Sequence, residues 1–233
     1  MRVYISISLS QSRISGDRVH DFMNGESGVV PDFEKRSDED ECNRALICRL
    51  LAATTRGELG SILAEEVGRY SLFDLQIIGG RLNSEIEKLP SPYREAISPF
   101  FREQLFGKHH RLLLMNRSGA FGQLNIPIRD AESFRKFCEM LPAGIPAWHD
   151  TSERNPYFRN PKNRLFYYLI AAFTMFVLEE PGHPVGMPFP GGFKVEQQGS
   201  NYYCFIRDKE KEIFYSICNF CPALQTEESG NDK

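Results

Sequence analysis

Three cysteines close to the C-terminus have a spacing that is typical of a metal site. Two residues separate Cys218 from Cys221, and thirteen residues separate Cys204 from Cys218. A two-residue gap lets both sulfurs of a tight turn face one cation, which is why this spacing recurs in zinc knuckles. We therefore predict that Cys204, Cys218 and Cys221 ligate one metal ion, with zinc as the first choice.

The motif lacks a fourth ligand, and several residues are candidates for it. His183 is the first choice, because the proline-rich loop that holds it leads directly into the segment of Cys204. Cys138 and His110 are alternatives, and a water molecule would complete an open site. A closed site with four protein ligands is structural, whereas an open position permits catalysis.

Other interpretations of the cysteines stay open. An iron–sulfur cluster is a weaker alternative, because cubane clusters normally use four thiolates. Cys218 and Cys221 could form a redox dithiol, although the βαβ context of thioredoxin-like motifs is absent from the sequence. Three half-buried cysteines without a metal are also an ordinary outcome, because free cysteine is among the most buried residue types.

A loop dense in proline and glycine, residues 181–192, precedes the cysteines. Proline stiffens such a loop and glycine permits its turns, so the pattern requires no function. As a functional interpretation, the loop forms a rigid wall for a ligand, and Met187 and Phe189 provide apolar contacts. An enzyme would instead use His183, Glu180 and His110 around the cysteines.

Two segments fix the expected architecture. Residues 165–178 are apolar on nearly all sides, which indicates a buried helix with other helices around it. Residues 193–198 and 201–206 are β-like runs separated by Gly199 and Ser200, the pattern of a β-hairpin. We expect a mainly α (α+β) protein with a small C-terminal hairpin and a cysteine knuckle.

Local signals mark where the helices begin and where the domain lies. Ser71 and Asp74 have the spacing of a capping box, and Asp130 is the expected cap of a later helix. Ser98-Pro99 also has the pattern of a helix start. We expect a flexible extension over residues 1–40, one domain over 41–225 and a frayed tail over 226–233.

Composition narrows the classes of partner. The net charge is −3, so no global basic field points to nucleic acid. Lys108, Arg111, Arg117 and Arg129 form a modest basic group, which we interpret as a solvated helix face. The sequence shows neither an apolar run of spanning length nor a secretory signal pattern, so we expect a cytoplasmic protein without a membrane partner. Six cysteines in that compartment favour metal binding or burial over disulfides.

Several stretches together resemble a known family. They lie at residues 70–76, 92–95, 110–113, 137–141, 171–176 and 181–184, and they include Tyr203-Cys204 and the segment from Cys218 to Ala223. The chain resembles the uncharacterised archaeal protein family 0305, also called domain of unknown function 2115, which is typical of methanogens. The resemblance covers about residues 60–225. It implies a cytosolic archaeal protein and makes an iron–sulfur or redox role more credible, but it supplies no mechanism.

The residues favour a non-catalytic module in which a metal ion stabilises a binding surface over residues 181–193. The partner is an unknown protein or small molecule. The alternative is a metal- or thiol-dependent enzyme, redox or iron–sulfur in kind, with its site at the knuckle and the loop.

Overall fold

Helices make up most of the chain. The structure, a computed structural model, describes residues 33–145 and 161–226. The α-helices are α1 (Phe33–Ala52), α2 (Arg56–Val67), α3 (Leu72–Glu87), α4 (Tyr93–Arg102), α5 (Lys108–Arg117), α6 (Ala131–Gly144) and α7 (Pro161–Ala172). The π-helical segments Glu103–Gly107 and Phe173–Val177 continue α4 and α7. The prediction of a mainly α-helical protein is confirmed.

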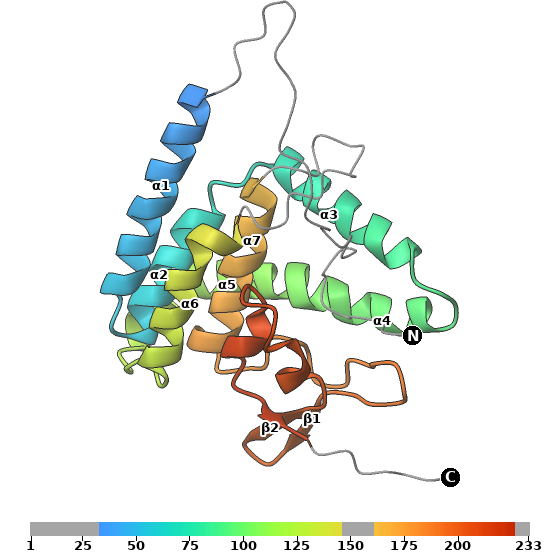
Figure 1. Cartoon of the computed structure of the whole chain (residues 1–233). Helices are drawn as coiled ribbons and strands as arrows, with labels where there is room; N and C mark the ends of the chain where they lie inside the picture. The colour runs from blue at the N-terminus through green and yellow to red at the C-terminus, as the bar shows by residue number, and fades with distance from the viewer. Residues whose placement is uncertain (1–32, 146–160, 227–233) are drawn as a thin grey trace, which may run out of the picture.

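Helix α7 and its π-helical continuation form the centre of the core. From residue 165 to residue 177 every side chain is buried except that of Tyr167, which is half-buried. Helices α2 and α6 pack against α7, as Figure 1 shows. The predicted buried helix is therefore confirmed. Over the described ranges, no helix combines the length and the apolar character needed to cross a membrane.

Side-chain caps start the helices that surround the core. Ser71 Oγ accepts a hydrogen bond from the backbone N–H of Asp74 at 3.2 Å, and Asp74 Oδ2 accepts one from the N–H of Ser71 at 2.8 Å. Thr55 and Glu58 form a second capping box at α2. Asp130 Oδ1 accepts a hydrogen bond from the N–H of Ser133 at the start of α6. The caps predicted at Ser71 and Asp130 are confirmed.

Two predicted boundaries differ from the structure. Helix α1 already begins at Phe33, so residues 33–40 of the predicted extension are helical. Residues 1–32 and 227–233, which hold the rest of the predicted extension and nearly all of the predicted tail, lie outside the described residues. The predicted helix start at Ser98-Pro99 is wrong, because α4 runs from Tyr93 through Pro99.

A small sheet completes the fold. Strands β1 (Glu196–Gln198) and β2 (Asn201–Cys204) pair antiparallel around Gly199 and Ser200, which confirms the predicted hairpin. Strand β3 (Leu224–Gln225) pairs with β2 in parallel. The 3₁₀-helical segments Arg207–Glu210 and Ile217–Phe220 lie between β2 and β3. We call residues 181–226 the C-terminal module; Figure 1 shows its sheet at one end of the helical body.

The proline–glycine loop is folded on itself by backbone hydrogen bonds. The N–H of Gly186 donates to Val195 O at 2.8 Å, and the N–H of Phe189 donates to Phe193 O at 2.7 Å. The buried side chain of Gln104 donates to Gly182 O at 2.8 Å. Hydrogen bonds therefore hold the loop in one conformation and connect it to the helices of residues 33–178, which we call the helical body.

A backbone contact between distant segments places the start of α6. The N–H of Arg56 donates to Ile126 O at 2.8 Å, and the N–H of Gly57 donates to Leu124 O at 3.0 Å. A Cβ atom at Gly57 would lie 2.2 Å from Phe121 O, so the segments approach too closely for any side chain at this position. This contact holds the chain that leads directly into Arg129 and Asp130.

Candidate functional site

The structure brings the three predicted cysteine ligands into one buried region. Cys204 ends β2, Cys218 lies in the 3₁₀ segment and Cys221 follows it. All three thiols are buried, with exposures of 3%, 4% and 6% in chain order. Burial raises the pKa of Cys204, Cys218 and Cys221. These thiols are therefore protonated at neutral pH.

Backbone N–H groups point at two of the sulfurs. The N–H of Gly182 donates to Cys221 Sγ at 3.3 Å. Hydrogen bonds from the backbone of Ala223 and Gly182 counteract the effect of burial on the pKa of Cys221. The backbones of Ile206 and Arg207 act in the same way on Cys204, although burial still raises its pKa to about 11. Hydrogen bonds of this kind favour the thiolate, which is the form that binds metals.

The arrangement is not that of an assembled metal site. Across residues 33–145 and 161–226, no group of three or more His, Cys, Asp or Glu side chains is placed to hold a metal ion. Ligation would also require the thiols of Cys204, Cys218 and Cys221 to lose their protons. The predicted zinc ion and the alternative iron–sulfur cluster stay predictions.

The fourth-ligand candidates occupy different environments. His183 follows Gly182 directly and is 5% exposed, with its ring edge-on to Phe189 at a centroid distance of 5.8 Å. Burial lowers the pKa of His183 to about 4, so its ring is neutral. Cys138 lies fully buried in α6, and His110 is exposed on α5. Of these three, His183 is adjacent in sequence to a residue that contacts a cysteine.

The loop residues predicted to contact a ligand lie in the core. Met187 is 0% exposed and Phe189 is 3% exposed. A ligand in contact with either side chain would have to enter the protein interior. The exposed residues of the loop are instead Val185, Pro190, Gly191 and Gly192.

Glu180 and the basic residues of α5 are ion-paired. The Glu180 carboxylate accepts hydrogen bonds from Lys108 and, at 2.6 Å, from Arg111. Lys108 is 9% exposed, so its predicted place on a solvated helix face is wrong. Glu180 is thus held by α5, and the structure gives it no bond to His183.

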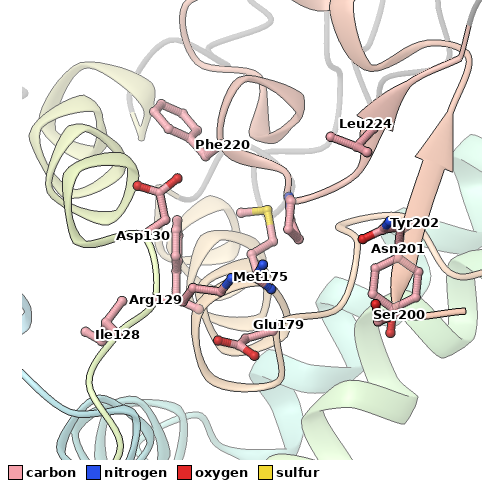
Figure 2. Close-up of a pocket in the computed structure, with 12 residues that line it drawn as sticks. Ile128, Arg129, Asp130, Met175, Glu179, Ser200, Asn201, Tyr202, Phe220 and Leu224 are labelled. Carbon is pink, nitrogen blue, oxygen red and sulfur yellow. The ribbon is translucent and has the colours of Figure 1, made fainter.

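A pocket lies where the helical body meets the C-terminal module. Its volume is about 250 Å³. Figure 2 shows Arg129 and Asp130 on one side, Tyr202 of the hairpin on the other and Met175 between them. The lining residues are Ile128, Arg129, Asp130, Met175, Phe176, Glu179, Ser200, Asn201, Tyr202, Phe220, Pro222 and Leu224. Sequence reasoning missed this pocket, because its walls come from segments far apart in the chain.

Glu179, which lines this pocket, has an unusual backbone conformation. Its φ is 58°, and it is the non-glycine residue with positive φ in the described part of the chain. It follows the π-helical end of the central helix, a position where glycine is the usual residue. Arg56 donates from Nε to Val177 O at 2.7 Å and pairs with the Glu179 carboxylate at 3.4 Å. Arg56 therefore fixes both the helix end and the Glu179 side chain.

Comparison with known proteins finds relatives in methanogenic archaea. Residues 55–226 match a family described as "Uncharacterized protein conserved in archaea", with domain of unknown function 2115. A UPF0305 protein of Methanopyrus kandleri is 32% identical over 139 residues, which cover 60% of this chain and 88% of that protein. A UPF0305 protein of Methanocaldococcus jannaschii is 25% identical over 174 residues, 73% of this chain and 96% of that protein.

A shorter match has higher identity. A UPF0305 protein of Methanothermobacter thermautotrophicus is 40% identical over 57 residues, 24% of this chain and 35% of that protein. No solved structure matches the chain.

Proposed function

This chain belongs to the archaeal family with domain of unknown function 2115, and we propose that it is a non-catalytic binding protein whose C-terminal module is fastened by a soft metal ion, zinc by our choice. The ligands are Cys204, Cys218 and Cys221, with His183 as the fourth. The module and the helical body together form the binding surface.

The hydrogen bond from Gly182 N–H to Cys221 Sγ at 3.3 Å is the observation that carries this proposal. It ties the loop that holds His183 to the knuckle, although nearly 40 residues separate the two in the chain. The donors at Cys204 and Cys221 match what a bound thiolate requires, because each N–H stabilises negative charge on sulfur. A buried thiolate without such donors or a cation would be costly.

The module needs a stabilising device because its regular structure is short. Its strands hold three, four and two residues. An isolated hairpin of this size is marginally stable in water, whereas a structural zinc site contributes on the order of 10 kcal/mol. A metal ion that joined Cys204, Cys218 and Cys221 would close β2, the knuckle and β3 into one unit.

Metal analysis tests the proposal directly. We expect about one zinc ion per chain after purification under reducing conditions, measured by inductively coupled plasma mass spectrometry. Cys218→Ser and Cys221→Ser should lose the metal, whereas Cys48→Ser should keep it, because Cys48 is exposed on α1. Chelation should unfold the C-terminal module, detected by faster proteolysis within residues 181–226.

A second measurement needs only the wild-type protein, so it tests the proposal even if the cysteine variants do not fold. The wild-type protein, treated with a chelator and then titrated with Co²⁺, should develop the absorption of a cobalt–thiolate complex. A wild-type protein that contains no metal and takes up neither Zn²⁺ nor Co²⁺ would overturn the proposal. A brown protein that contains iron would replace zinc with an iron–sulfur cluster and overturn the assignment of zinc.

A further inference from the structure

We propose that the pocket between α6, the end of the central helix and the hairpin binds a small organic anion with an apolar body, and that Arg129 holds its charged group. This inference rests on the binding role proposed above, but it does not depend on the metal. Its evidence is the distribution of charge and apolar surface around the pocket.

Arg129 is the charged group of the pocket that is left for a ligand. The other two charged side chains that line it already have partners: Glu179 pairs with Arg56 at 3.4 Å, and Asp130 accepts from the N–H of Ser133 at 2.9 Å. Arg129 is exposed, and the structure gives it no hydrogen bond or ion pair with another described residue. Figure 2 shows its side chain reaching into the pocket.

The floor of the pocket is apolar and fixed. Met175 and Phe176 are buried, at 3% and 5% exposure, and they come from the π-helical segment. Phe220 packs edge-on against Phe137 at 5.4 Å, and Phe176 packs on the same ring at 5.5 Å. A flat apolar group could lie on this floor without moving the core.

The size of the pocket limits the ligand. A volume of about 250 Å³ is slightly below the usual range for drug-sized ligands, so a ligand of one or two rings fits and a polymer does not. Tyr202 and Asn201 of the hairpin provide polar groups on the opposite side.

Three probes with one naphthyl body separate the contributions of charge and apolar area. They are 1-naphthyl phosphate, 1-naphthoate and the neutral 1-naphthalenemethanol, titrated calorimetrically into the full-length protein as purified. We expect at least one of the anions to bind about 5-fold more tightly than the alcohol, the upper end of what an ion pair at an exposed site gives. The two anions distinguish a phosphate ligand from a carboxylate ligand.

Arg129→Gln should remove that preference and leave the affinity for the alcohol unchanged. Arg117→Gln is the matched control, because Arg117 is exposed at the end of α5 and does not line the pocket. Equal affinities of the alcohol and both anions, no binding of any probe, or an unchanged preference in Arg129→Gln would each overturn the inference.

The outcomes also separate this inference from the metal proposal. Protein that contains no metal but discriminates the anions through Arg129 would overturn the metal clip and support the pocket. Protein that contains zinc on Cys218 and Cys221 but binds all three probes equally would do the reverse.

Discussion

Two glycine-to-alanine substitutions should change stability in opposite directions, and together they test how the pocket is positioned. Gly80 is exposed within α3, and a Cβ atom there would meet nothing within 4 Å. Alanine should stabilise the protein by about 0.5–1 kcal/mol, because glycine has the lower helix propensity. At Gly57, by contrast, the added Cβ would lie 2.2 Å from Phe121 O and 3.0 Å from Leu124 O.

The cost at Gly57 follows from what the clash would displace. Both obstructing atoms belong to the backbone, so no side-chain rotation relieves the overlap. The 120–128 segment would have to move away from α2 and weaken the hydrogen bonds from Arg56 and Gly57, at 2.8 and 3.0 Å. Two weakened hydrogen bonds and the lost packing together cost about 3 kcal/mol.

Urea denaturation of the wild type, Gly57→Ala and Gly80→Ala measures the free energy of unfolding of each. We expect the two variants to differ by about 4 kcal/mol with similar m-values. The naphthyl phosphate titration is a second readout, because the displaced segment carries Arg129. A Gly57→Ala variant within about 1 kcal/mol of the wild type would refute the described contact between α2 and this segment.

Ion pairs and the strained residue beneath the pocket support three further predictions. Glu180→Gln should cost about 2 kcal/mol of unfolding free energy in the same assay, because Lys108 would stay buried without its charged partner. The pKa of Glu180 lies below 4.5: burial acts to raise it, but Lys108 and Arg111 outweigh burial. The stability from this ion pair is therefore present above pH 4.5 and should be lost as the pH falls through the lowered pKa. In Glu180→Gln, the free energy of unfolding should fall less steeply with decreasing pH than in the wild type. Glu179→Gly should leave the free energy of unfolding unchanged or raise it by up to about 1 kcal/mol. Glycine removes the cost of the positive φ, and only the 3.4 Å ion pair with Arg56 is lost. A loss of more than about 1 kcal/mol would contradict this prediction.

The sequence predicted those features that depend on neighbouring residues. The capping box of Ser71 and Asp74 closes over three residues, and the hairpin turns at Gly199 and Ser200. Both structures arise wherever the chain has the right residues at these short spacings. The same reasoning located the buried central helix, because apolar residues on all sides of a helix require neighbours on all sides.

Features that depend on distant contacts were not predictable from local patterns. The π-helical end of the central helix is defined by hydrogen bonds such as Leu178 N–H to Phe173 O, and its residues 173–177 include no glycine or proline that would mark a change of helix type. The parallel pairing of Tyr203 with Leu224 brings together segments about twenty residues apart. Arg129 was predicted to lie on a solvated helix face, because its sequence neighbours do not reveal the pocket that forms beside it.

Two of the predicted metal ligands and a wall of the pocket lie in one short segment, residues 218–222, and this determines which variants are informative. Phe220 and Pro222 line the pocket, while Cys221 between them is buried and accepts from Gly182 N–H. Any substitution of Cys221 therefore shifts a wall of the pocket, and a loss of probe binding in that variant says nothing about which group contacts the ligand. Arg129 comes from a different segment, which is held by the contact between α2 and the chain before α6. Arg129 is thus the position at which ligand binding can be altered while the cysteines and any metal they hold are left in place.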